Sequence, residues 1–145
     1  MVTTKFRCHK KVRYWQKSRT SAAIFIYNLP LMEIDILLEY SDRKQLRQWL
    51  EENHATAHHC WVTAYRSKVP KLDALPYLAI VEEALCFGWI DSTNKRLPDG
   101  RLAQRISPRR KNSHWTELNI ARVRDLEQRG LMTPAGIAAL PLNNG

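Results

Sequence analysis

The sequence predicts an α+β fold, in which a small antiparallel sheet containing a β-hairpin packs with about three to four helices. Segments with the two-residue period of strands are interspersed with segments that have the 3.6-residue period of helices. Two strand-like runs flank one clear turn sequence, Leu97-Pro98-Asp99-Gly100. The length of 145 residues and the hydrophobic fraction of 44% suit one globular domain with a substantial core.

The first half of this domain predicts a strand, a helix and a second strand. Residues 33–40 predict a short strand or an entry segment, and Ser41 is a suitable N-cap for a helix over 42–53. The segment HHCWVTAYR, residues 58–66, places bulky or branched side chains on both faces, which indicates an interior strand. The helix is expected to bury a stripe of Leu46, Trp49 and Leu50.

The most regular helical pattern follows a loop at 67–76 that contains two prolines. Apolar residues keep one face of this helix, and Gly88 stands where a helix C-terminus needs a left-handed residue. Glu82 and Glu83 are expected to point away from the core.

The remaining residues predict the hairpin and two further helices. Strands at 90–97 and 101–107 form the hairpin, because proline and glycine occupy the positions that a tight turn requires. Asn112 or Ser113 caps a helix that runs to about residue 129, and Thr133 starts a short last helix in front of a proline.

The net charge of +9 is concentrated at the start of the chain. Residues 1–19 carry seven Lys or Arg residues and no acid, whereas residues 20–145 carry 16 basic and 14 acidic groups. The body of the protein is therefore only weakly basic. We expect residues 1–31 to be a basic N-terminal extension outside the fold, and residues 32–145 to be a single domain.

A local basic cluster nevertheless lies on predicted elements. Residues 95–111 contain seven Lys or Arg residues and a single acid, Asp99. Arg101 and Arg105 share one face of the second hairpin strand, and such guanidinium groups can hold a phosphate or carboxylate ligand. The alternative is a solvated charged face whose arginines pair with acids elsewhere in the fold.

The helix after the hairpin would place Trp115, Asn119 and Arg122 on one stripe. An inward-facing guanidinium needs a charged partner or a wet cleft. Asp91 is a candidate partner, because it lies close to Trp89 where the preceding helix meets the hairpin. Three interpretations are open: an ion pair of Asp91 with Arg122 or Arg105, a ligand groove walled by the two tryptophans, and catalysis with the aspartate as general base.

Metal and nucleophile chemistry is not indicated. His58 and Cys60 point the same way in a strand, but no second ligand pair with zinc-site spacing accompanies them. The three cysteines form no CxxC pair, which indicates reduced thiols in a cytosolic protein. Ser113 and His114 lack a third partner for a triad. We therefore assign no cofactor, no metal site and no catalytic residue.

Apolar runs are too short to predict a membrane span. Nucleic acid is a further alternative partner, since Trp89 and Trp115 flank the basic cluster and a base can stack on an indole while arginines hold phosphates. No signature of an RRM, KH, zinc-finger or helix-turn-helix domain accompanies these residues. We expect a cytoplasmic protein that is a monomer or a weak dimer.

Three motifs resemble the YdeI/OmpD-associated family, whose members are also described as bacteriocin-protection proteins. They are ALCFGWID at 84–91, PRRKNSHW at 108–115 and N-x-x-R-V at 119–123. A WLEENHATAHHCWV block precedes them and GLMTPAG follows, so the similarity covers about residues 36–140. The resemblance implies a small bacterial α+β protein linked to bacteriocin tolerance and envelope stress, without an established reaction.

Members of that family usually begin near the position of Met32 and continue beyond the TPAG helix, so the resemblance also implies a domain shortened at its C-terminus. We expect a non-enzymatic protection or stress protein that binds an anionic ligand or a protein partner. The alternative is a small hydrolase or transferase that acts on a phosphate- or carboxylate-bearing substrate. The expected groove is lined by Trp89, Asp91, Arg101, Arg105, Trp115, Asn119 and Arg122.

Overall fold

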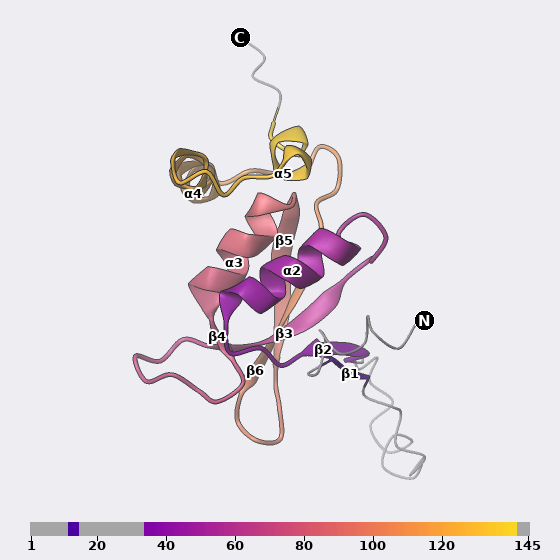
Figure 1. Ribbon diagram of the computed structural model, residues 1–145, viewed down its shortest axis with the longest axis vertical. Coiled ribbons are helices and arrows are strands. Elements are labelled where there is room, and N and C mark those ends of the chain that lie inside the picture. The colour runs from indigo at the N-terminus through magenta and orange to yellow at the C-terminus, as the bar shows by residue number, and fades with distance from the viewer. Residues whose placement is uncertain (1–11, 15–33, 142–145) are drawn as a thin grey trace.

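A computed structural model describes residues 12–14 and 34–141, which form one sheet and four helices (Figure 1). None of the described helices combines the length and the apolar composition that are needed to cross a bilayer. The strands are β1 (Val12–Tyr14), β2 (Ile36–Leu38), β3 (Cys60–Tyr65), β4 (Leu75–Pro76), β5 (Trp89–Arg96) and β6 (Leu102–Pro108). The helices are α2 (Arg43–Asn53), α3 (Tyr77–Cys86), α4 (Glu117–Gln128) and α5 (Pro134–Ala138).

The predicted α+β class is confirmed, but the sheet is mixed rather than purely antiparallel. Its strand order is β1-β2-β3-β6-β5, and β4 pairs separately with β3. Strand β3 runs parallel to β2 and β4 and antiparallel to β6. The parallel pair arises because β2 connects to β3 through helix α2, and such a crossover returns the chain in the same direction.

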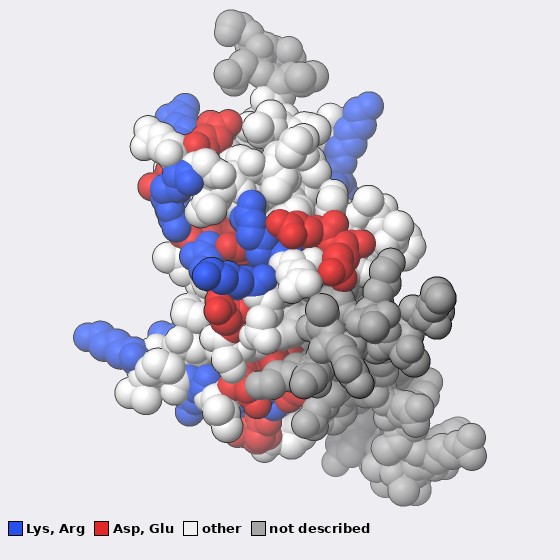
Figure 2. All heavy atoms as spheres, viewed as in Figure 1, with Lys and Arg blue, Asp and Glu red and all other residues white. Residues whose placement is uncertain are grey.

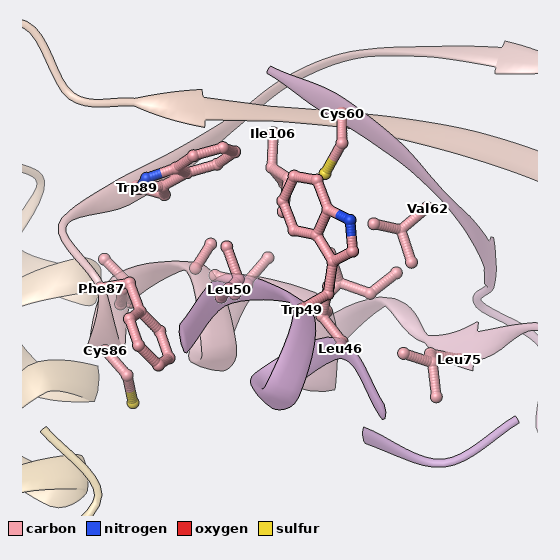
Figure 3. Packing of buried hydrophobic residues seen from close by; sticks show 14 of the residues in the cluster. Leu46, Trp49, Leu50, Cys60, Val62, Leu75, Cys86, Phe87, Trp89 and Ile106 are labelled. Carbon is pink, nitrogen blue, oxygen red and sulfur yellow. The ribbon is translucent and has the colours of Figure 1, made fainter. Parts of the chain in front are cut away.

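The main core lies between the helices and one face of the sheet. Figure 3 shows Trp49 and Leu50 of α2 together with Cys60, Val62 and Ile106 of the strands. Trp49 meets Trp89 edge to face, with ring centroids 6.0 Å apart and an interplanar angle of 84°. Alternate strand residues point to the other face, where a second buried cluster contains Leu37, Trp61, Leu97 and Ala103.

Two helices begin later than the sequence predicts. Asp42, not Ser41, caps α2, because its carboxylate accepts from Lys44 N while Gln45 reaches back to the Asp42 backbone in a capping box. Thr116, not Asn112 or Ser113, caps α4. Residues 109–115 therefore form a loop, and Trp115 precedes the helix that was expected to contain it.

The predicted hairpin is confirmed. Strands β5 and β6 pair antiparallel, with a register shift between Asp91 and Asn94 that marks a bulge. Gly100 has a φ of 88°, which accounts for glycine at the end of the turn. Gly88 and Gly130 likewise have positive φ values after α3 and α4.

A short part of the basic N-terminal extension pairs with the sheet. Val12–Tyr14 forms β1, which lies antiparallel to β2 with Arg13 opposite Leu37. The sequence does not predict this strand. Residues 1–11, 15–33 and 142–145 lie outside the described residues, so the expected boundaries of the domain and its expected C-terminal shortening stay predictions.

Glu83 is buried, which corrects the expectation that it points away from the core. It is 2% exposed and accepts ion pairs from two arginines of α2, at 2.8 Å from Arg43 Nη2 and 3.0 Å from Arg47 Nη1. Glu82 joins the same network through Arg43 at 3.0 Å and Arg129 at 3.7 Å. Figure 2 shows the resulting mixture of basic and acidic side chains over α2 and α3.

Glu83→Gln is expected to lower the free energy of unfolding by about 1–3 kcal/mol, because two partly buried guanidinium groups each lose one charged partner, although Arg43 keeps Glu82. The matched control is Glu51→Gln, since Glu51 is 58% exposed and lies 3.8 Å from Arg47 Nε. The free energy of unfolding of this control variant should fall by less than about 0.5 kcal/mol. Urea unfolding of both variants checks this, and equal losses would contradict a structural role for the Glu83 pairs.

Helix α5 docks on the end of α3 through a close backbone approach. Thr133 Oγ1 donates to Cys86 O at 2.5 Å, and a Cβ on Gly136 would lie 2.2 Å from that same oxygen. Gly136→Ala is therefore expected to cost about 2–4 kcal/mol of unfolding free energy.

The control for this docking is Gly130→Ala. A Cβ there meets nothing within 4 Å, so only the φ of 69° opposes it and the expected cost is about 1–2 kcal/mol. If chemical denaturation gives the two alanine variants the same stability, α5 does not pack against Cys86 in this way.

Candidate functional site

The loop of residues 109–115, which we call the basic loop, has a defined conformation. Arg109 N donates to Gly88 O at 3.0 Å where β6 ends, and Ser113 N donates to Arg110 O at 3.1 Å. Asn112 has a φ of 67°, a left-handed conformation that asparagine tolerates better than most residues. Lys111 and Asn112 are the central residues of this turn, and Arg110 at its start is exposed as they are.

Arg109 holds the loop together from inside. Its guanidinium carbon lies 3.6 Å from the centroid of the Trp115 ring, and Nη1 donates to Ser113 Oγ at 3.1 Å and to His114 O at 3.3 Å. Burial lowers the pKa of Arg109, and the nearby charge of Asp91 partly offsets this effect. Arg109 is thus committed to the loop, whereas its two basic neighbours are not.

A cavity of about 420 Å³ lies between the basic loop and α5. Its polar wall consists of residues 110–113, and its apolar wall consists of Trp115, Ala138, Leu140 and Pro141. Both walls are fixed to the end of α3, the loop through Gly88 O and α5 through Cys86 O. The cavity is therefore built on a rigid support.

The charge of this cavity is positive. Arg110 and Lys111 line it, and no acidic residue is among its lining residues. Within the described part of the chain, neither cation forms an ion pair with a carboxylate. An anion that enters the cavity therefore meets two cations whose charge is not neutralised by the fold.

Of the seven expected groove residues, Trp115 alone lines this cavity. Trp89 is 1% exposed and donates its indole N–H to His54 O at 3.4 Å, so it is a core residue and cannot form a groove wall or stack on a base. The sequence shows that Trp89 is aromatic but does not show that its side chain points into the core. The basic cluster over residues 95–111 includes Arg110 and Lys111, whereas no sequence pattern indicated that α5 would lie beside them.

Arg101 and Arg105 do not grip one ligand together. They are four residues apart, about 13 Å along a strand. Arg101 pairs with Glu39 at 2.7 Å and with Asp99 at 2.6 Å, so its charge is used within the fold. Arg105 pairs in register with Trp61 on the sheet face opposite α2 and α3, and its Nη1 lies 3.5 Å from Ser92 Oγ. The expected groove is thus divided between two faces of the sheet.

The proposed ion pair between Asp91 and Arg122 is not formed. Arg122 Nη1 donates to Asn119 Oδ1 at 3.0 Å within α4, and Asp91 Oδ2 accepts from Tyr77 Oη at 2.5 Å. Among the described residues, Arg122 has no carboxylate at ion-pairing distance. The brace interpretation of the helix stripe is therefore wrong.

Tyr77 and Asp91 form a half-buried pair that the sequence did not predict. The guanidinium carbon of Arg66 lies 3.9 Å from the Tyr77 ring centroid. The charges of Arg66 and Arg122 both lower the pKa of Tyr77. Burial and the hydrogen bond to Asp91 raise the pKa of Tyr77 above 10.0. The carboxylate that was considered as a general base is thus occupied by a phenol.

Tyr77→Phe is expected to cost about 1–2 kcal/mol of unfolding free energy near pH 8, because the ring stays and the hydrogen bond is lost. Since the pKa of Tyr77 is raised in the folded chain, its contribution is complete below pH 10.0 and decreases as the pH rises through the raised pKa. Urea unfolding at pH 8 and at strongly alkaline pH should show the gap between wild type and variant narrowing. A gap that is constant with pH would contradict the role of this hydrogen bond.

Thiols and acids of the described residues offer no metal centre. Cys60 and Cys86 are free and buried, and burial raises the pKa of both thiols. No group of three or more His, Cys, Asp or Glu side chains that could hold a metal ion occurs in residues 12–14 and 34–141. Cys8 lies outside the described residues.

The fold and the site define a small α+β domain with a basic loop over a cavity. Residues 38–139 match a family described as a domain of unknown function (DUF8412), and the chain belongs to this family. No curated protein and no solved structure matches the chain. The family description names no ligand or reaction.

Proposed function

We propose that this protein binds a small organic anion in the cavity between the basic loop and α5. The observation that carries the proposal is the composition of the cavity walls. Arg110 and Lys111 supply positive charge, while Trp115 and Leu140 supply apolar surface. A ligand that joins a phosphate or carboxylate group to an apolar or aromatic body fits both walls.

Each side chain of the cavity has a definite role in this proposal. Arg110 and Lys111 attract and hold the anionic group, and the Ser113 hydroxyl is a further hydrogen-bond donor. Trp115 receives the apolar body of the ligand. Arg109 does not touch the ligand but fixes the Trp115 ring through its stacking contact.

Phenyl phosphate is the probe that tests both walls at once, with inorganic phosphate and phenol as its two halves. We expect phenyl phosphate to bind more tightly than either half at low ionic strength. The double variant Arg110→Gln/Lys111→Gln should weaken its binding about tenfold, since each exposed charge contact contributes roughly 0.5–1 kcal/mol. Isothermal titration calorimetry provides the measurement.

The control removes two charges elsewhere, as Lys44→Gln/Arg124→Gln, because both side chains are exposed and lie outside the cavity. This variant should bind phenyl phosphate as the wild type does. Equal weakening by both double variants would mean that net charge alone attracts the probe. If the wild-type protein binds neither phenyl phosphate nor inorganic phosphate, the proposed anion site is wrong.

We further propose that anion binding in this cavity protects a bacterial cell against bacteriocins or envelope stress, and that the protein acts in the cytoplasm. The alternative occupant of the cavity is a protein partner with an exposed carboxylate. The support is the resemblance to the YdeI/OmpD-associated family. Expression of the wild type should raise the survival of a sensitive host under bacteriocin challenge, and Arg110→Gln/Lys111→Gln should not. If the wild type and the double variant protect the host equally, the protective role does not depend on this cavity.

A further inference from the structure

The loop of residues 66–72, between β3 and β4, presents apolar side chains to solvent. Val69 is 73% exposed and Leu72 is 83% exposed, the two highest values among the large apolar side chains that the structure describes as exposed. Figure 1 shows this loop extending away from the sheet. Single exposed apolar side chains are common, but two of them near the tip of one projecting loop indicate an interaction surface.

The base of this loop is fixed although its tip is exposed. The carbonyl of Asp73 accepts from Thr63 Oγ1 at 2.5 Å and from Arg101 Nη1 at 3.1 Å. Ser67 Oγ donates to Val69 O at 2.6 Å within the tip. The loop is therefore held by hydrogen bonds and not by burial of its own apolar side chains.

The same loop is basic. Arg66, Lys68 and Lys71 are exposed, and residues 66–72 contain no acid. A cavity of about 240 Å³ lies at the foot of the loop, and four of its lining residues are cations, namely Arg66, Lys71, Arg96 and Arg101. No acidic residue is among those that line it. Figure 2 shows basic side chains where the loop projects from the molecule.

The acids near this loop line a different cavity. Glu39, Asp73 and Asp99 line a neighbouring cavity of about 390 Å³, which Lys71 and Leu72 also border. Arg101 pairs with Glu39 and Asp99, and Ser41 Oγ donates to Asp73 Oδ1 at 3.1 Å. These acids are thus engaged at the base of the loop, while the lysines at 68 and 71 make no ion pair with a described residue.

We propose that the loop of residues 66–72 docks on an anionic lipid surface. Val69 and Leu72 enter the boundary between headgroups and acyl chains, while Lys68 and Lys71 contact the headgroups and the cavity beside Arg96 receives a lipid phosphate. An aliphatic tip favours lipid over nucleic acid, because valine and leucine offer no ring on which a base can stack. The surface shares no residue with the cavity of the basic loop, so it is independent of the proposed function.

The test inserts a reporter into the tip of the full chain. Leu72→Trp is mixed with phosphatidylcholine vesicles, with and without phosphatidylserine, whose acyl chains carry bromine as a quencher. The emission that Trp adds at position 72 should be quenched in the vesicles that contain phosphatidylserine, and added salt should reverse the effect. Leu118→Trp is the matched control, since Leu118 is 60% exposed on α4 and its replacement should not be quenched.

Variants separate insertion from general attraction, which the seven basic residues of 1–19 can also cause. Val69→Ser/Leu72→Ser should weaken vesicle binding about tenfold through loss of apolar burial. Leu118→Ser/Ile137→Ser removes comparable exposed side chains elsewhere and should leave binding unchanged. Lys68→Gln/Lys71→Gln should also weaken binding, and most strongly at low salt.

Four results would each overturn the proposal. The first is a chain that binds vesicles while the tryptophan at position 72 stays unquenched. The second is wild-type vesicle affinity in Val69→Ser/Leu72→Ser. The third is equal affinity for vesicles with and without phosphatidylserine. The fourth is binding of inorganic phosphate with no binding to any vesicle.

Discussion

The buried carboxylate of Glu83 is the constraint on which the arrangement of charge in this protein depends. A carboxylate that is 2% exposed must be paired, and Glu83 takes Arg43 and Arg47 from α2 for that purpose. This joins α2 to α3, and α3 in turn supports α5 through Cys86 O and begins beside Asp91 through Tyr77. The position of one helix therefore determines where both walls of the basic-loop cavity stand.

Because buried charges must be paired, some arginines hold the fold together and others stay available to a ligand. Arg101 is neutralised by two acids, and Arg109 is committed to Trp115 and to the loop backbone. Arg110 and Lys111 form no ion pair with a described residue, and they line a cavity that also has apolar lining residues. The proposed anion site thus follows from the charges that the fold leaves over, and not from the total of +9.

Local sequence patterns predicted most helices and strands, but they could not predict which way individual side chains face in the folded chain. The turn at Leu97–Gly100 and the cap at Thr133 were readable because single residues determine such features. The burial of Glu83 could not be predicted, since it requires two arginines that are 40 and 36 residues away in the sequence to face it. The site was predicted as one groove because residues near in sequence were assumed to share a face, but Arg105 lies on the sheet face opposite α3 and Trp89 enters the core. Trp115 is the one predicted groove residue that lines the basic-loop cavity, and the contribution of α5 to this cavity could come only from the fold.

The central claim is that Arg110 and Trp115 receive an anion while the paired arginines do not. The most direct measurement is a proton–nitrogen correlation spectrum of arginine Nε and tryptophan indole groups during titration with phenyl phosphate. We predict that the signals of Arg110 and Trp115 shift with a common saturation curve, while those of Arg43, Arg47 and Arg101 stay in place. Shifts at the paired arginines with an unchanged Trp115 indole would contradict this account.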